Sequence, residues 1–269
     1  MKATLIISVY KNVPFLKAVL DSFGLQTEKD VEIIIAEDGQ DEGVMKFVSA
    51  YPFECPYLHV RQTDDGWRKN RVLNKAIKAS NSNWLIFIDG DCVMHERFIE
   101  MHLRFAAPNR ILAGKRVKLN NTLSEYLMIE RMNAKNIQAI LRRKLLGRKQ
   151  GLQFVEDGIF VSPDGLLGFI PRKRSNEKLL GCNMSFSKDA IYAINGFDED
   201  YVLPAFGEDR DLSWRFIGAG YTHFSLRNMA IVYHLHHKMG WSDQEENMEK
   251  YRKKKDKNEF VCCNGLEKL

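Results

Sequence analysis

Two aspartates separated by one glycine end the apolar stretch LIFIDGDC at residues 85–92. In an extended chain, side chains at positions i and i+2 point the same way, so Asp89 and Asp91 would face one space together. Two such charges repel each other unless they share a proton or hold a cation or a ligand between them. The pair is therefore a candidate site. An ordinary exit from a strand into a turn is the alternative, because Asp-Gly is a common turn dipeptide.

Two further acidic clusters occur along the chain, AEDG at 36–39 and GEDRDLSWR at 207–215. The first follows a predicted strand, so its carboxylates can converge with those of the Asp-Gly-Asp stretch on one crevice. The second lies where a helix is expected to begin. Acidic residues there also suit the positive end of a helix dipole, which is the purely structural interpretation of Asp209 and Asp211.

Alternating strand and helix patterns in the first half of the chain would bring these clusters together. The predicted strands cover 3–9, 31–38, 57–61 and 84–91, and helices are predicted between them at 14–24, 42–50 and 68–80. This alternation predicts an α/β fold with a mostly parallel sheet flanked by helices. Ligands of such sheets bind beyond the carboxyl ends of the strands, where Asp38, Asp89 and Asp91 would lie.

The pattern changes after Leu119. A long helix is predicted over 122–150 and loop over 151–178, where glycine, proline and mixed charge prevail. Order is expected to resume with a short helix that Ser187 caps and Gly196 closes. The remaining predicted elements are a helix at 209–219, a strand at 229–235 and a solvated, lysine-rich helix from residue 244.

Composition narrows the class of protein. With 269 residues, 45% hydrophobic and 28% charged, the chain can bury a full core, and no stretch approaches the roughly 20 apolar residues of a membrane span. The first residues read as a strand and not as a signal peptide. Five cysteines without C-x-x-C spacing argue against a disulfide framework and a structural zinc site. A reducing, cytoplasmic location is therefore expected, and no nucleic-acid partner.

Taken together and in this order, the clusters resemble those of the family 2 nucleotide-sugar glycosyltransferases, which have the GT-A (Rossmann-like) fold. The residues that carry the resemblance are LIISVYKNVPFL, EDG, FIDGDC as the D-x-D motif, GCNMSF before NGFDED, and GEDRDLSWR. The portion from about residue 180 is similar to a galactosyltransferase-like module. The resemblance covers most of the chain except roughly 120–178.

The resemblance implies one continuous GT-A domain in three parts. Residues 1–119 would form the nucleotide-sugar-binding half, 120–178 a helical and loop insertion, and 179–269 the acceptor and catalytic-base half with a basic C-terminal helix. The reaction implied is an inverting, metal-dependent transfer from a nucleotide-diphosphate sugar, expected to be a UDP-sugar, to a hydroxyl of a saccharide or glycolipid. Cell-surface polysaccharide or lipopolysaccharide synthesis is the expected setting.

In this family a divalent ion, Mn²⁺ or Mg²⁺, neutralises the leaving diphosphate. The resemblance assigns Asp91 as a metal ligand, and Asp89 would contact the ribose or share the metal. Asp38 would accept a hydrogen bond from the base. Ser8 and Tyr10 would line the nucleotide pocket. This chain departs from the usual pattern in having Val9 before the aromatic residue and Glu37 before Asp38.

The remaining donor-side residues implied are Arg68 and Arg71, either of which could contact the diphosphate, with a surface ion pair as the alternative. On the acceptor side, Asp209 would be the base that takes the proton of the attacking hydroxyl, and Glu208 would hold acceptor hydroxyls. Asp211 and Arg215 are expected to form a structural ion pair.

The stretch YHLHH at 233–237 closes the set. Related enzymes place a histidine after this late strand as a third metal ligand, and His234 matches that position best. His236 is the alternative, because positions i and i+2 share a face. His237 is expected to point away.

Other functions fit less well. A nicotinamide dehydrogenase would need G-x-G-x-x-G after the first strand, where this chain has SVYKNVP. A nucleotidyltransferase that forms nucleotide-sugars shares the α/β plan but carries a glycine-rich basic loop that is missing here. A non-catalytic carbohydrate-binding protein of the same fold is a further alternative, and the intact Asp89, Asp91 and Asp209 weigh against it.

A basic amphipathic segment, AKNIQAILRRKLLGRK, lies at 134–149. Its apolar residues fall near one helical face beside a row of basic residues, a pattern found in helices that lie on anionic membranes. The chain would then meet a glycolipid acceptor at the cytoplasmic face of an inner membrane. A core-packing helix with a solvated basic edge is the alternative.

Overall fold

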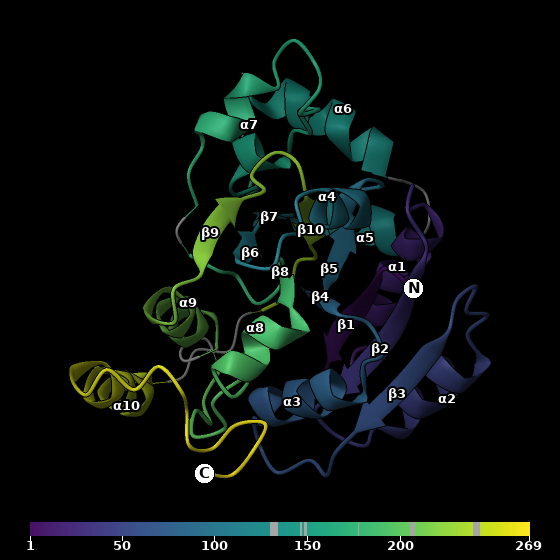
Figure 1. Ribbon diagram of the computed structural model, residues 1–269. Helices are drawn as coiled ribbons and strands as arrows, with labels where there is room; N and C mark the ends of the chain where they lie inside the picture. Colours follow the sequence, from purple (N-terminus) through teal and green to yellow (C-terminus); the bar gives the residue numbers. More distant parts are fainter. Residues whose placement is uncertain (130–133, 146, 148–149, 177, 205–207, 239–242) are drawn as a thin grey trace.

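The computed structural model describes residues 1–129, 134–145, 147, 150–176, 178–204, 208–238 and 243–269 (Figure 1). Its main sheet has seven strands in the order β3-β2-β1-β4-β8-β6-β9. These strands are β1 (Ala3–Val9), β2 (Val31–Glu37), β3 (Tyr57–Arg61), β4 (Trp84–Asp89), β6 (Arg110–Ala113), β8 (Met184–Ser187) and β9 (Thr222–Ser225). The first four are parallel neighbours, β8 runs antiparallel between β4 and β6, and β9 pairs parallel with β6. The predicted mixed, mostly parallel sheet is confirmed.

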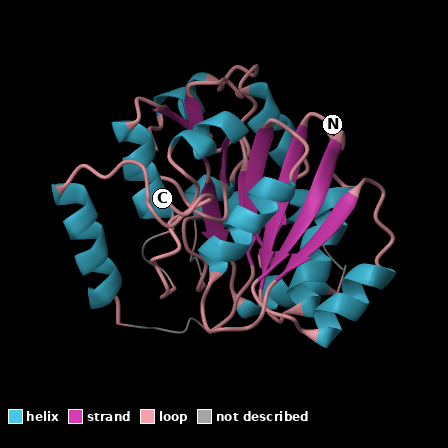
Figure 2. Ribbon diagram, turned by 60° about the horizontal axis from the view of Figure 1, so that its bottom comes forward, coloured by secondary structure: helices cyan, strands magenta, loops and turns pink. Residues whose placement is uncertain are grey.

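Helices cover both faces of this sheet (Figure 2). On one face lie α1 (Val13–Gly24), α2 (Glu42–Ala50) and α4 (Phe98–Arg104), and on the other α3 (Lys69–Ala79), α8 (Lys188–Ala193) and α9 (Asp209–Gly218). The strands are apolar at successive positions because both faces are buried: Ile7 packs with the first group of helices, and Ile6 with the second. The carboxyl ends of β1 and β4 therefore extend from strands that are packed on both faces.

A smaller sheet in the order β5-β10-β7 carries the late histidines. Its strands are β5 (Cys92–Met94), β7 (Lys115–Lys118) and β10 (Ile231–His234). Strand β10 runs antiparallel to β5 and parallel to β7, with His234 opposite Cys92. This pairing places His234 beside the end of the Asp-Gly-Asp stretch.

The single long helix predicted over 122–150 is wrong. Helix α5 (Asn121–Met128) ends at a cap formed by Ile129, and a separate helix, α6, covers Ala134–Leu145. Ile137 and Leu141 of α6 are buried in a third apolar cluster with Tyr233 of β10, and Gln138 donates a hydrogen bond of 2.6 Å to the Tyr233 hydroxyl. Leu123 and Leu127 of α5 belong to the same cluster, so both helices turn apolar side chains toward it.

This packing weakens the membrane interpretation of the basic segment, because Ile137 and Leu141 are buried in the core and are not available to contact lipid. Arg142 and Arg143 remain exposed, while Arg148 and Lys149 lie outside the described residues. The rest of the molecule contains the short η1 (Val155–Gly158) and α7 (Phe169–Lys173), and α10 (Glu245–Asp256) at the edge of the molecule (Figure 1). No helix among the described residues is both long and apolar enough to cross a membrane.

Candidate functional site

A cavity of about 640 Å³ opens beyond the carboxyl ends of β1 and β4. The residues that line it come from the first strand and helix, the loop before α3, and the Asp-Gly-Asp stretch: Ser8, Val9, Tyr10, Asn12, Phe15, Asp38, Gly66, Trp67, Lys69, Asp89, Gly90, Asp91 and His237. Five predicted donor-site residues, Ser8, Tyr10, Asp38, Asp89 and Asp91, thus line one cavity, as expected for residues near the strand ends of a parallel sheet.

The glycine between the two aspartates has a structural reason. Strand β1 pairs with β4 so that Ser8 lies opposite Asp89, and the Ser8 hydroxyl donates a hydrogen bond of 2.7 Å to Asp89 Oδ1. The Gly90 N–H donates to the Ser8 carbonyl at 2.7 Å, and a Cβ at residue 90 would lie only 3.0 Å from that oxygen. A side chain there would push the two strand ends apart.

Asp38, directly after β2, is held by two hydrogen bonds. Its Oδ1 accepts from Gln62 Nε2 and its Oδ2 from the Arg68 N–H, both at 2.8 Å. These bonds fix the loop that presents Trp67 to the cavity. Tyr10, 54% exposed, adds a second aromatic ring at the cavity wall, so two flat apolar surfaces border this end.

The two arginines predicted beside the donor are not among the residues that line the cavity. The Arg68 guanidinium lies 3.5 Å from the carboxylate of Asp65, and Arg71 is exposed. Lys69, which the sequence reasoning overlooked, points inward instead. Its Nζ lies 2.6 Å from Asp89 Oδ1 and 2.7 Å from Glu208 Oε1. Only its place between two other basic residues could have drawn attention to it.

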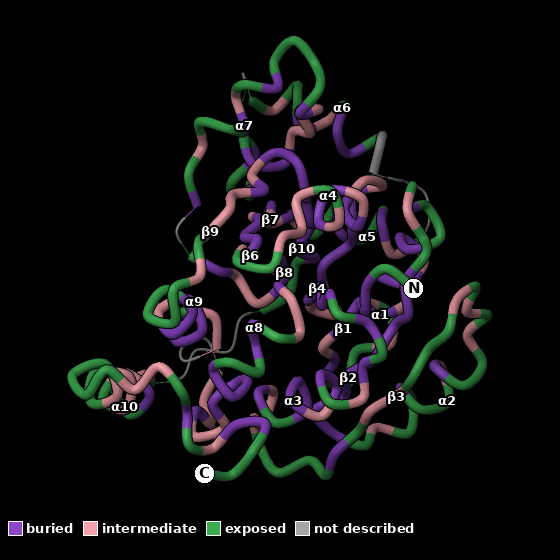
Figure 3. The backbone as a smooth tube through the Cα atoms, in the orientation of Figure 1, coloured by how far each residue is buried: buried purple, intermediate pink, exposed green. Residues whose placement is uncertain are grey.

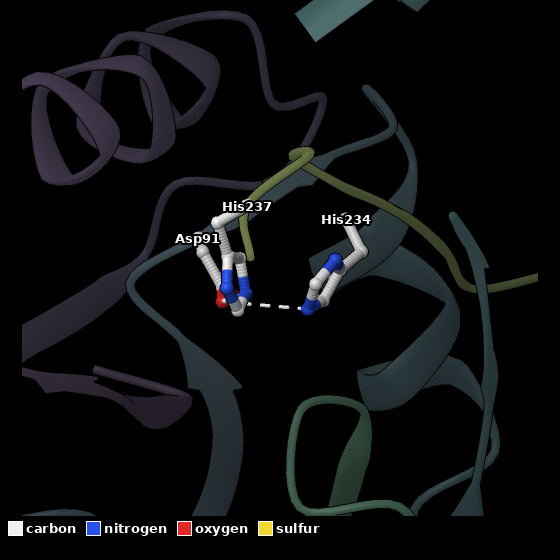
Figure 4. Close-up of side chains that lie close together, drawn as sticks. All are labelled: Asp91, His234 and His237. Carbon is white, nitrogen blue, oxygen red and sulfur yellow. Dashed lines mark hydrogen bonds and ion pairs between the residues drawn. The ribbon is translucent and has the colours of Figure 1, made fainter. Parts of the chain in front are cut away.

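A carboxylate and two imidazoles come together beside the cavity, whose lining includes Asp91 and His237 (Figure 4). Asp91 Oδ2 lies 3.0 Å from His237 Nε2 and 3.4 Å from His234 Nε2, and the three possible ligand atoms are all within 4.8 Å of one another. Burial raises the pKa of the Asp91 carboxyl, but the hydrogen bond from His237 and the nearby His234 outweigh it and lower the pKa to about 2. An ionised carboxylate with two imidazoles suits a divalent first-row metal ion.

The expectation that His237 points away is wrong. Strand β10 ends at His234, so the alternation of side chains between faces does not continue to the following residues. The Leu235 N–H donates to the Asp91 carbonyl at 2.8 Å, and the chain then brings His237 back to the Asp91 carboxylate. His236 is exposed, its N–H donates to the Ser124 hydroxyl, and it does not belong to the cluster.

The third acidic cluster lies on the other side of Lys69. Glu208 and Asp209 stand at the start of α9, while Gly207 of the same motif lies outside the described residues. Burial, together with the negative charges of Asp89 and Asp209, raises the pKa of Glu208 to about 7 against the opposing effect of Lys69. Burial also raises the pKa of Asp209, and a hydrogen bond from the Gly181 backbone opposes it.

Two features fix this cluster. A Cβ at Gly181 would lie 2.1 Å from Glu208 Oε1, so the absence of a side chain there makes room for the glutamate. The predicted structural ion pair is confirmed: Arg215 Nε lies 2.6 Å from Asp211 Oδ2, and both side chains are fully buried. This buried ion pair joins the first turn of α9, which contains Asp211, to its last turn, which contains Arg215.

Comparison with known proteins gives two family matches in sequence order. The model of glycosyl transferase family 2 matches residues 4–166, and the model of the N-terminal domain of galactosyltransferase matches residues 169–238. The first match spans more than half of the chain.

Curated relatives are bacterial glycosyltransferases. Chondroitin synthase of Escherichia coli is 24% identical over 242 residues, which is 86% of this chain and 34% of that protein. EpsJ of Bacillus subtilis, an uncharacterized glycosyltransferase, is 24% identical over 249 residues, 83% of this chain and 70% of that protein. The chain thus spans about a third of the length of the first relative.

Solved structures share the fold. The mannosyltransferase PcManGT of Pyrobaculum calidifontis, in complex with GDP-Man and Mn²⁺, superposes with a TM-score of 0.56 at 15% identity, covering 89% of this chain and 58% of that chain. TarS of S. aureus in complex with UDP-GlcNAc superposes with a TM-score of 0.59 at 14% identity, covering 93% and 64%. The predicted GT-A fold is confirmed.

Proposed function

The chain belongs to glycosyl transferase family 2, and from this premise we propose an inverting, metal-dependent transfer of a sugar from a nucleoside diphosphate to a hydroxyl of a saccharide or glycolipid. The observation that carries the proposal is the order of groups along the site. The cluster of Asp91, His234 and His237 is followed by Asp89, Lys69 and the carboxylates of Glu208 and Asp209. This order matches a leaving group at one end and an attacking hydroxyl at the other.

The metal centre of the proposal consists of Asp91, His234 and His237. Their oxygen and nitrogen atoms fit Mn²⁺ or Mg²⁺, although two imidazoles favour Mn²⁺ because Mg²⁺ prefers oxygen ligands. The complex of PcManGT with Mn²⁺ supports the use of a divalent ion in this fold. A bound ion would neutralise the charge that develops on the departing diphosphate.

The nucleotide is assigned to the cavity between Tyr10 and Trp67. Flat apolar rings suit a planar base, and Asp38 and Asp89 provide acceptors for the N–H and hydroxyl groups of a nucleoside. A uracil base is the expectation, which the complex of TarS with UDP-GlcNAc supports. Lys69 keeps Asp89 and Glu208 in fixed positions and adds a positive charge between them.

Asp209 is the proposed base. Its carboxylate would accept the proton of the acceptor hydroxyl as that oxygen bonds to the anomeric carbon, while the bond from this carbon to the diphosphate oxygen breaks on the opposite face. The sugar therefore changes configuration. Glu208 would hold hydroxyls of the acceptor. The bacterial chondroitin synthase relative supports an acceptor in surface polysaccharide synthesis.

The proposed reaction is tested with a panel of UDP-, GDP- and dTDP-linked sugars in the presence of Mn²⁺ and saccharide acceptors, and in a separate assay with sugar phosphates and nucleoside triphosphates. One donor should be consumed with release of its nucleoside diphosphate, and NMR of the product should show the anomeric configuration opposite to that of the donor. Release of nucleoside diphosphate with retained configuration would overturn the inverting mechanism. Condensation of a sugar phosphate with a nucleoside triphosphate would indicate a nucleotidyltransferase instead.

A further inference from the structure

An apolar tip, formed by Leu166, Leu167 and Phe169, projects from the loop that leads into α7. Their exposed fractions are 99%, 57% and 54%. The loop lies beside α7 at the extreme top of the molecule in Figure 1, and the exposed colour marks its outermost turn in Figure 3. Single exposed leucines are ordinary on protein surfaces, but three large apolar side chains within four residues on a projecting turn indicate an interaction site.

The tip is held in one conformation by its own hydrogen bonds. The Gly165 N–H donates to the Ser162 carbonyl at 3.1 Å, and the Gly168 N–H donates to the Gly165 carbonyl at 2.8 Å. A Cβ at Gly168 would lie 2.3 Å from the Pro163 carbonyl oxygen, so the turn closes tightly there. The leucines are therefore exposed by a folded turn, and their exposure does not come from a loose segment.

The base of the loop is fixed to the body of the protein. Both Asp164 carboxylate oxygens accept hydrogen bonds of 2.5 Å from the Arg104 guanidinium of α4. A bidentate pair of this kind restrains orientation as well as position. It also neutralises the acidic side chain nearest to the leucines.

Positive charge flanks the tip. Arg172 and Lys173 of α7 are exposed, and Lys173 Nζ lies 5.8 Å from the centre of the Phe169 ring. Arg174, the next basic residue, turns inward to Asp157 and Asn228. The exposed surface around the tip thus combines apolar side chains with two cations, of which Arg172 also donates a hydrogen bond of 3.3 Å to the Pro163 carbonyl at the base of the turn.

We propose that the apolar tip inserts into the interfacial layer of an anionic lipid bilayer, with Arg172 and Lys173 against the lipid phosphates. Leucine and phenylalanine gain from burial among acyl chains, and lysine and arginine are attracted to anionic headgroups. The exposed Arg142 and Arg143 of α6, at the same end of the molecule in Figure 1, add to the attraction. This surface replaces the apolar face of α6, which is buried in the core.

A convex tip of three side chains suits a lipid layer better than a second protein surface. Stable protein interfaces bury about 800 Å² on each partner and require a complementary face. A lipid layer deforms around an inserted turn and needs no complementary shape. The proposal is independent of the donor and metal assignments.

The test is co-sedimentation with two kinds of vesicle, one of phosphatidylcholine alone and one in which phosphatidylglycerol replaces part of it. The protein should sediment with the anionic vesicles, and less so as salt is raised. Leu166→Ser with Leu167→Ser should weaken vesicle binding by on the order of 10-fold or more. Arg172→Gln with Lys173→Gln should weaken it by about 30-fold, given the usual contribution of each basic residue at such a surface.

Matched controls separate the tip from general surface properties. Leu25→Ser alters a leucine that is 54% exposed at the end of α1 and should leave vesicle binding unchanged. Arg252→Gln with Lys255→Gln removes the same charge from exposed positions of α10, at a distant edge of the molecule, and should have a smaller effect. UDP binding and thermal unfolding should match the unchanged protein in every tip variant.

Equal sedimentation of the tip variants and the unchanged protein would overturn the proposal, as would a protein that stays in the supernatant at low salt. A fall in oligomeric mass on Leu166→Ser with Leu167→Ser, without vesicle binding, would assign the tip to contact between copies of this chain. If the unchanged protein does not bind UDP, the donor assignment is contradicted, and the proposal for the tip is not.

Discussion

Asp209 is the residue on which the proposed chemistry depends most. Asp209→Asn keeps the size and hydrogen-bonding reach of the side chain while it removes the basicity. Turnover should fall by a factor on the order of 10² to 10⁴, with binding of the nucleotide unchanged. Initial rates of nucleoside diphosphate release, with calorimetry on the same variant, check this. Near-normal turnover would move the base to another carboxylate.

Glu208 provides a pH prediction. Its pKa is raised from the usual 4.5 to about 7, mainly because the carboxyl is buried. Between these values the folded protein keeps a proton that the unfolded chain has released, so this residue makes the free energy of unfolding fall as pH rises from about 4.5 through 7. Above that range its stabilising contribution is lost.

Urea unfolding at a series of pH values, on the unchanged protein and on Glu208→Gln, checks the sign. The glutamine variant cannot titrate at this position, so its free energy of unfolding should depend less on pH across the window. A steeper dependence in the variant, or an identical one, would contradict the raised pKa.

The sequence predicted the position of a site residue where the backbone geometry fixes the direction of its side chain. Asp89 ends β4 and Asp91 lies in the turn before β5, and both line the cavity as predicted, although the predicted strand extended over both. His237 could not be placed from sequence, because it follows the end of β10 and its direction depends on the turn after Leu235. Lys69 was missed because its role depends on Glu208, a contact of residues 139 positions apart that no local pattern encodes.

At the scale of elements, α3 is fixed to the second half of the chain by buried asparagines. Asn70 Nδ2 donates to the Asp198 carbonyl at 2.7 Å. Asn74 donates to the Phe197 carbonyl and accepts from its N–H, both at 2.8 Å. These bonds set the position of the first residue of α3, Lys69, between the two acidic groups.

Gly181 tests how closely the start of α9 must be placed. Gly181→Ala puts a methyl carbon 2.1 Å from the present position of Glu208 Oε1, and the glutamate can move because it is a flexible side chain. Turnover should fall by on the order of 10- to 100-fold, because small displacements of active-site groups cause losses of this size. The free energy of unfolding should change little.

Gly24→Ala is the matched control, because a Cβ at Gly24 meets nothing within 4 Å. It should leave both turnover and stability close to those of the unchanged protein. If Gly181→Ala behaves in the same way as this control, Glu208 does not need its present position for the reaction.

The elements themselves were predictable where the pattern is periodic. Strands β1 to β4, helices α1 to α3 and the Ser187 cap of α8 all agree with the sequence, and the Ser187 hydroxyl accepts from the Ala190 N–H at 3.1 Å. The strands β5 to β9, three or four residues each, were not predicted, because such short segments carry too little alternation to identify. Their places in the sheets depend on tertiary pairing.

At the scale of the whole molecule, the site is assembled from both halves of the chain. Strand β8 of the second half pairs antiparallel with β4 of the first, and this brings the start of α9 opposite the Asp-Gly-Asp stretch. The sequence predicted the α/β class and the edge of the sheet at which the cavity opens. It could not predict the order β4-β8-β6, since strand order depends on packing between distant segments.

We expect Asp91, His234 and His237 together to hold a divalent ion that the nucleoside diphosphate needs. Isothermal calorimetry of UDP binding, with Mn²⁺ and with EDTA, tests this expectation most directly on the unchanged protein, His237→Ala and His236→Ala. Mn²⁺ should strengthen UDP binding to the unchanged protein. His237→Ala should reduce this gain by on the order of 10- to 100-fold, which is the usual effect of mutations around metal sites. His236→Ala should keep the gain. Equal UDP affinity with Mn²⁺ and with EDTA, or loss of the gain in His236→Ala alone, would show that these three residues do not form the metal site.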